Sequence, residues 1–149
     1  MTTVVLDASV QVGWILPDEP WHTAALAVAH RIADGRLDAV VVPNSRFEVC
    51  NALIKAARRG RIGWVRVAGR LAQLDNLAIR IDAEPFEIDA LLAACRDYQL
   101  SWGDAHHALL ARRLARPLLT ADERLVRALR DSDIWVESIL DRPADEGDQ

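Results

Sequence analysis

Residues 3–15, TVVLDASVQVGWI, decide the fold of this chain. The apolar and partly β-branched run at 3–7 is typical of a short buried strand, and it ends at Asp7. The next segment, 8–15, is predicted to be a helix that begins directly after this aspartate. A strand that passes straight into a helix is typical of the opening of an alternating α/β domain.

The same alternation continues along the chain, with proline and glycine between the apolar segments. We expect further strands at 38–43, 78–82, 117–120 and 134–137, and helices at 21–33, 44–59, 62–76, 85–98, 103–115 and 122–130. The apolar side of the helix at 85–98 is expected to carry Ile88, Leu91, Leu92 and Cys95. Strands that alternate with helices predict an α/β fold, a three-layer α/β/α sandwich around a mostly parallel sheet of about five strands.

The length of 149 residues predicts one domain, which we place at 1–140, followed by a polar and disordered tail at 141–149. The two cysteines, Cys50 and Cys95, show no zinc-binding spacing and are expected to be reduced, as in a cytoplasmic protein. The N-terminus lacks the basic region of a signal peptide, and no apolar run reaches the length of about 18 residues that spans a bilayer. We therefore expect a soluble protein with no membrane association.

Four acids fall at corresponding ends of the predicted elements: Asp7, Glu48, Asp104 and Asp122. In an open parallel sheet, ligands bind outside the carboxyl ends of the strands, and all four acids can face that edge. Several carboxylates at one edge repel one another, and the usual reason to tolerate this is a hard divalent cation with oxygen ligands. The four acids together therefore indicate a metal site.

Each acid taken singly also has an ordinary structural role. An aspartate before a helix is most often an N-cap, which applies to Asp7, Asp104 and Asp122. Glu48 can belong to a solvated stripe with Asn51 and Lys55, which share its helix face.

These segments resemble the PIN-domain family, especially the toxin ribonucleases of VapBC-type toxin–antitoxin pairs. The resemblance spans most of the chain and rests on four short motifs in order: VVLDASV (4–10), FEVCNAL (47–53), SWGDAHHALLA (101–111) and LLTADERL (118–125). Gly103 departs from the family pattern, because many relatives have an aromatic residue there, and we expect Trp102 to supply that packing.

The resemblance implies a Mg²⁺- or Mn²⁺-dependent endoribonuclease that is the toxin component of a type II toxin–antitoxin system. By it, the catalytic and metal-binding residues are Asp7, Glu48, Asp104 and Asp122. Residues expected to orient the acids or bound water are Ser9, Asn51 and Thr120, for which a capping or surface role is the alternative. It further implies an RNA substrate, a cognate antitoxin protein and a homodimer.

Other side chains near the acids have two interpretations each. His106 and His107 follow Asp104 in a helix, where adjacent residues point about 100° apart, so at most one of them faces the site. Trp14 and Trp102 are candidates to stack bases in an RNA groove, with burial in the core or at a dimer interface as the alternative. Net charge is −4, but arginines gather at 58–61 and 112–116, and such clusters can bind phosphate or simply be solvated.

Rival functions are judged from residues at the same positions. A phosphotransferase of the haloacid-dehalogenase type needs a second aspartate where Ser9 stands, and a receiver domain needs a late lysine, whereas Lys55 is the sole lysine. A housekeeping RNA-processing nuclease of the same family stays open as an alternative, although a compact chain suits a toxin better. A PIN-like module that binds RNA or a partner without cleaving it also stays open.

Overall fold

The computed structural model describes residues 1–141. Its strands are β1 (Thr2–Leu6), β2 (Leu37–Val41), β3 (Ile79–Ile81), β4 (Leu118–Thr120) and β5 (Val136–Ser138). Its helices are α1 (Ala8–Ile15), α2 (His22–Ala33), α3 (Ser45–Arg58), α4 (Val67–Leu74), α5 (Ile88–Tyr98), α6 (Trp102–Leu114) and α7 (Glu123–Leu129), with a short 3-10 helix, η1 (Trp64–Arg66). The predicted tail, 141–149, lies outside the described residues except for Asp141.

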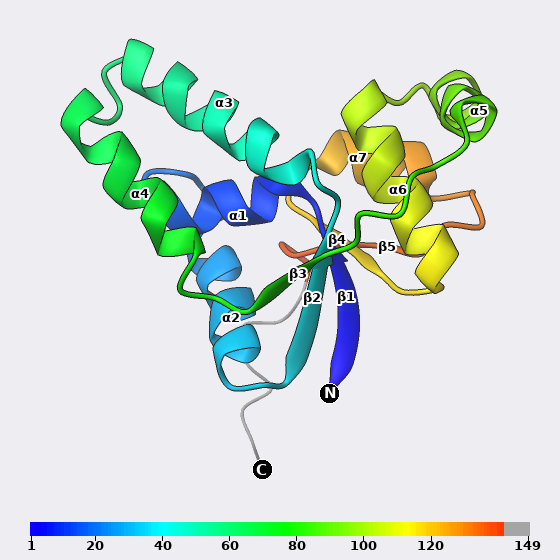
Figure 1. The fold of residues 1–149 in the computed structure, drawn as a ribbon, viewed down its shortest axis with the longest axis horizontal. Coiled ribbons are helices and arrows are strands. Elements are labelled where there is room, and N and C mark those ends of the chain that lie inside the picture. Colours follow the sequence, from blue (N-terminus) through cyan, green and yellow to red (C-terminus); the bar gives the residue numbers. More distant parts are fainter. Residues whose placement is uncertain (142–149) are drawn as a thin grey trace.

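The five strands form one sheet in the order β3-β2-β1-β4-β5, and every neighbouring pair is parallel. Helices α1 to α4 cover one face of this sheet and α5 to α7 cover the other (Figure 1). Side chains alternate between the two layers as a pleated strand requires: Val4 and Leu6 pack with α1 to α4, and Val5 packs with α5 to α7. The expected three-layer α/β/α fold is confirmed.

The strand order places a change of direction at β1. From β1 the chain adds β2 and β3 on one side of the sheet, and it then crosses to add β4 and β5 on the other. Ligands of open α/β sheets bind outside the carboxyl ends of the strands at such a point. Asp7 directly follows β1, and Thr120 ends the adjacent β4, so the fold places these residues at the expected binding edge.

Two local expectations are corrected by the structure. The helix expected at 62–76 is shorter and begins with the 3-10 turn η1. In α5, Ile88 and Leu92 are exposed by 66% and 53%, although we expected them on the apolar side. The stripe that packs against the second core layer has the i, i+3, i+4, i+7 spacing of a helix face and consists of Leu91, Ala94, Cys95 and Tyr98.

Within residues 1–141, no helix combines the length and the apolar character that crossing a membrane requires. Both cysteines in this part of the chain are free, and each is partly buried.

The contact between α1 and α2 depends on Gly13. The Trp21 indole N–H donates a hydrogen bond to the Ser9 carbonyl at 2.9 Å, which holds its ring against α1. A Cβ atom on Gly13 would lie 2.6 Å from Trp21 Cδ1 and 2.7 Å from Ala25 Cβ. Glycine is therefore needed here for close packing of the two helices, since no real Cβ approaches other carbon atoms so closely.

Replacing this glycine tests the packing. Gly13→Ala should lower the free energy of unfolding by about 1–3 kcal/mol because it overpacks a filled interface. The control is Gly69→Ala on exposed α4, where a Cβ meets nothing and the change should add up to about 1 kcal/mol through helix propensity. Urea unfolding of both variants measures the difference. An equal or greater stability of Gly13→Ala would contradict the packing argument.

Candidate metal centre

Asp7 is held in a fixed position between β1 and β4. Its carboxylate is buried and its Oδ2 accepts hydrogen bonds from the hydroxyls of Ser9, at 2.6 Å, and Thr120, at 2.7 Å. It stands at the N-cap position of α1, yet its side chain makes no capping hydrogen bond. The capping alternative is therefore wrong for Asp7, and its carboxylate is oriented by the two hydroxyl groups instead.

Glu48 reaches the same point from the first turn of α3. Its Oε1 accepts a hydrogen bond from Asn44 Nδ2 at 2.9 Å, and its two carboxylate oxygens lie 3.2 and 3.3 Å from His107 Nε2. The side chain is 30% exposed, so it is not the fully solvated residue of the surface-stripe alternative. Glu48 therefore enters the site as a carboxylate with fixed partners on α3 and α6.

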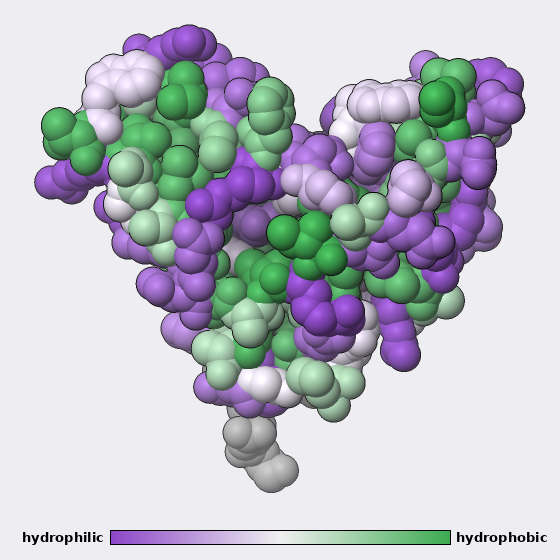
Figure 2. Space-filling model, viewed as in Figure 1, coloured by the Kyte–Doolittle hydropathy of each residue, from purple (hydrophilic) through white to green (hydrophobic). Residues whose placement is uncertain are grey.

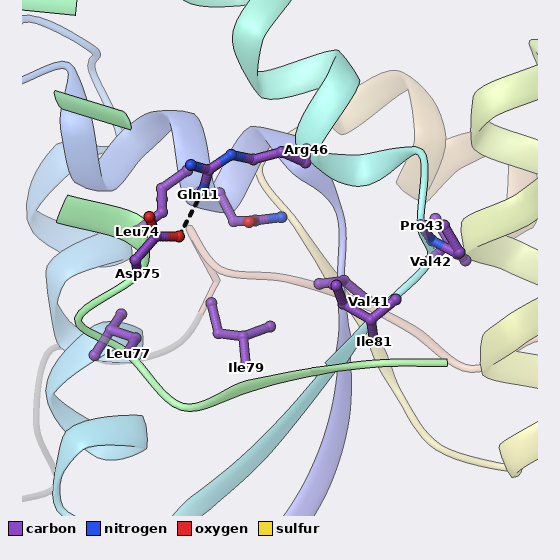
Figure 3. Close-up of a pocket in the computed structure, with 10 residues that line it drawn as sticks. All are labelled: Gln11, Val41, Val42, Pro43, Arg46, Leu74, Asp75, Leu77, Ile79 and Ile81. Atoms are coloured by element: carbon purple, nitrogen blue, oxygen red, sulfur yellow. Dashed lines mark hydrogen bonds and ion pairs between the residues drawn. The ribbon is translucent and has the colours of Figure 1, made fainter. Parts of the chain in front are cut away.

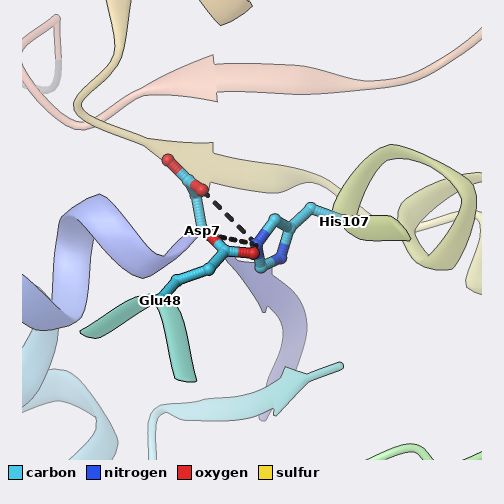
Figure 4. Close-up of side chains that lie close together, drawn as sticks. All are labelled: Asp7, Glu48 and His107. Carbon is cyan, nitrogen blue, oxygen red and sulfur yellow. Dashed lines mark hydrogen bonds and ion pairs between the residues drawn. The ribbon is translucent and has the colours of Figure 1, made fainter. Parts of the chain in front are cut away.

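His107 completes this group from α6 and is fully buried. Its Nε2 also lies 3.6 Å from Asp7 Oδ1 (Figure 4). Burial disfavours the charged imidazolium, but the hydrogen bond to Glu48 and the charges of Asp7 and Glu48 outweigh it and raise the pKa of His107. Ligand atoms of Asp7, Glu48 and His107 all lie within 4.8 Å of one another.

Asp104 and Asp122 form a second group around Arg124. The Arg124 guanidinium lies 3.1 Å from Asp104 Oδ2 and 3.4 Å from Asp122 Oδ2. Asp122 Oδ1 also accepts hydrogen bonds from the backbone N–H groups of Arg124 and Leu125, so the capping alternative is confirmed for Asp122.

Asp104 is not the cap of its helix, because Ser101 takes that position and its hydroxyl accepts a hydrogen bond from the Asp104 N–H. Burial, followed by the charge of Asp7, raises the pKa of the Asp104 carboxyl group. The two groups of acids are therefore close enough to interact electrostatically, as a converging set of carboxylates requires.

Three side chains that the sequence placed near the acids make no hydrogen bond to them within the described structure: Asn51, Trp14 and His106. Asn51 is exposed on α3, and among the described residues its side chain makes no hydrogen bond to the acids. Trp14 is buried in the core, where its indole N–H donates to the Ala25 carbonyl, so it is wrong as a candidate for an RNA groove. His106 points away and contacts the Trp102 carbonyl through Nδ1, while Trp102 itself is half exposed beside it.

Gly103 has a steric reason to be glycine. A Cβ atom there would lie 2.7 Å from Glu48 Oε1. The absent side chain leaves room for the Glu48 carboxylate at the start of α6. Trp102 is half exposed and packs edge-on against His106.

The surface has a notch between the two helical lobes. Figure 2 shows a notch between the lobe that carries α3 and α4 and the lobe that carries α5 and α6. The first turns of α3 and α6 border this notch, and a Cβ atom on Gly103 of α6 would lie 2.7 Å from Glu48 Oε1 of α3. A separate pocket of about 400 Å³ lies beside α4 and β3, lined by Leu74, Ile79 and the Arg46–Asp75 ion pair (Figure 3), and none of the four acids lines it.

The donor set fits a divalent cation. Carboxylate oxygens are the ligands that hard cations prefer, and Asp7 and Glu48 present theirs within 4.8 Å at a buried sheet edge. Two groups that can carry positive charge, His107 and Arg124, contact the acids. These two groups therefore reduce the repulsion between the carboxylates, and no apolar side chain has to separate the acids.

The raised pKa of Asp104 gives a pH dependence with a definite sign. Because the folded-state pKa lies above the unfolded value, the stability from this group is complete below about pH 3.8 and is lost as pH rises through the folded pKa. Asp104→Asn cannot ionise and should lose less stability than wild type as pH rises through this pKa, measured by urea unfolding without added metal.

The Arg124 charge lowers the Asp104 pKa, so Arg124→Gln should raise that pKa further in an NMR titration, with Arg127→Gln as control. A lower pKa in Arg124→Gln would contradict this.

Comparisons with known proteins agree with the fold. The closely similar folds include PAE2754 from Pyrobaculum aerophilum, with a TM-score of 0.66, 19% identity, and coverage of 93% of this chain and 92% of that one. They also include the toxin VapC20 of Mycobacterium tuberculosis, with a TM-score of 0.60, 14% identity, and coverage of 84% and 94%. No curated protein matches the chain. The PIN domain family model matches residues 4–130. This chain belongs to the PIN domain family.

Proposed function

We propose that this protein is a Mg²⁺- or Mn²⁺-dependent endoribonuclease and the toxin component of a type II toxin–antitoxin pair. The observation that carries the proposal is the pairing of buried Asp7 with partly buried Glu48 at the carboxyl end of the central strand, in a family whose members are generally metal-dependent nucleases. The toxin assignment rests on the four VapC-like motifs. Support for RNA as substrate comes from the fold shared with VapC20, which is described as cleaving the sarcin-ricin loop.

Each acid has a defined task in this proposal. Asp7, Glu48, Asp104 and Asp122 hold the cation with their carboxylate oxygens. A carboxylate-bound cation supplies a water of lowered pKa and neutralises charge on a phosphoryl oxygen. Ser9 and Thr120 keep Asp7 Oδ2 in place by donating their hydroxyl protons to it. Asp122 caps α7 with its Oδ1 atom, and these hydrogen bonds orient its Oδ2 atom for the cation. No contact in the described structure gives Asn51 a comparable task.

The notch between α3 and α6 is the proposed path of the RNA strand. Its acidic floor binds the cation, and the half-exposed indole of Trp102 offers a face on which a base can stack. Stacking favours an unpaired strand, because bases in a duplex are already stacked on one another.

The proposed partners are a cognate antitoxin and a second copy of the chain, acting in the cytoplasm. Arg124 shows how an arginine pairs with Asp104 and Asp122, and an antitoxin arginine can block the same carboxylates. Support for self-association comes from large apolar side chains on the surface of the α3–α4 lobe, namely Phe47, Trp64 and Val65.

RNA cleavage by purified protein tests the proposal. Asp7→Asn and Asp104→Asn should each reduce metal-dependent cleavage by at least about a hundredfold, since changes of mere outer partners already cost about 10–100-fold. Asp97→Asn is the control, because Asp97 is an exposed acid of α5 whose ion pair within the described part of the chain is with its neighbour Arg96. Cleavage mapping with and without Mg²⁺ or Mn²⁺ measures the effect. Undiminished cleavage by both variants would reject the assignment, and no cleavage by wild type would favour the non-cleaving alternative.

Metal binding by the protein alone gives a second test. At a hundred times its Kd, the cation should stabilise the fold by about 2.7 kcal/mol, which raises Tm by about 5–10 °C in a domain of this size. Asp7→Asn should lose most of this rise, and Asp97→Asn should keep it. Thermal melts with and without MgCl₂ or MnCl₂ at pH 7 measure the shift. A wild-type Tm that neither metal changes would remove the metal site from the proposal.

A further inference from the structure

His107 is placed as a component of the site although it is not an acid. Its side chain has no exposed surface, and its Nε2 points at both carboxylate oxygens of Glu48, at 3.2 and 3.3 Å. A buried polar side chain is retained where it has a hydrogen-bonding partner, and here that partner is a proposed metal ligand.

The other ring nitrogen shows where the proton is. His107 Nδ1 is buried and has no hydrogen-bond partner among the described residues. A neutral ring with its proton on Nδ1 would bury an unsatisfied N–H group and turn the Nε2 lone pair toward a carboxylate. A proton on Nε2, whether in the neutral ring or in the imidazolium, donates to Glu48 instead of turning a lone pair toward that carboxylate. Metal-binding histidines usually donate their second N–H to a protein group, and the described residues offer none.

The bond between His107 and Glu48 joins two layers of the fold. Glu48 belongs to α3, which packs on one face of the sheet, and His107 belongs to α6, which packs on the other. Asn44, which directly precedes α3, donates a hydrogen bond to Glu48 Oε1, and the missing side chain of Gly103 leaves room for the carboxylate. Of the two side chains that hydrogen-bond to the Glu48 carboxylate among the described residues, Asn44 and His107, His107 comes from the layer opposite to α3.

We propose that His107 is a positioning residue, which donates its Nε2–H to Glu48 and holds that carboxylate beside Asp7 ready for the cation. The inference rests on the metal-binding part of the proposed function. In this role, His107 makes the affinity of the protein for both Mg²⁺ and Mn²⁺ depend on a hydrogen-bond donor at position 107. The imidazole itself does not bind the cation.

Calorimetric titration of purified protein with MgCl₂ and MnCl₂ tests this. His107→Leu fills a similar volume but has no hydrogen-bond donor, and it should weaken the binding of both metals by about 10–100-fold. His107→Gln keeps an N–H donor and should restore the affinity for both metals to within about threefold of wild type. His106→Leu, on the neighbouring side chain that faces away, is the control and should bind as wild type does. Circular dichroism confirms that each variant is folded.

The outcomes separate the possible roles. Unchanged affinity in His107→Leu would overturn the proposal. Loss of Mn²⁺ affinity alone, equally in the leucine and glutamine variants, would also overturn it, because it would make His107 a nitrogen ligand. If His107→Leu does not fold, His107→Gln decides: it keeps an N–H donor, and loss of affinity for both metals in that folded variant would refute the donor role. Wild-type protein that binds neither metal would instead refute the proposed function itself.

Discussion

The constraint on which this structure depends is the burial of the Asp7 carboxylate at the end of the central strand. A buried charge is tolerated only with partners, and Asp7 has two hydroxyl donors and a nearby imidazole. One donor follows it in α1 and the other ends β4, so the carboxylate requires that β1 and β4 be adjacent. The strand order that creates the binding edge and the chemistry of that edge are therefore linked through one side chain.

The site is assembled from both helical layers. Glu48 comes from α3 on one face of the sheet, and Asp104 and His107 come from α6 on the other. Neither layer alone holds more than part of the set, so relative movement of α3 and α6 would change the spacing of the carboxylates. The hydrogen bond between His107 and Glu48 lies where the two layers meet and restrains that movement.

Positive groups of the chain itself balance the acids. Arg124 contacts Asp104 and Asp122, and the raised pKa of His107 reflects its carboxylate neighbours. Arg124 is largely exposed, so its ion pairs with these acids contribute little stability. His107 is buried and cannot be displaced without repacking α6. The two groups therefore differ: Arg124 is an exposed counter-ion of the acids, whereas His107 is part of the packed core under α6.

Local sequence determined the strands, most helix limits and the parallel sheet, because apolar periodicity, glycine and proline act over a few residues. It also identified the segments that carry the four acids. Only the tertiary structure decided what each side chain does, since these contacts join residues as distant as Asp7 and Thr120 or Glu48 and His107. The spacing of Asp104 and His107, one helical turn apart, was the one local signal for the histidine. Trp14, Ile88 and Leu92 were misplaced because burial depends on which elements pack against a helix, and that information is not contained in the helix itself.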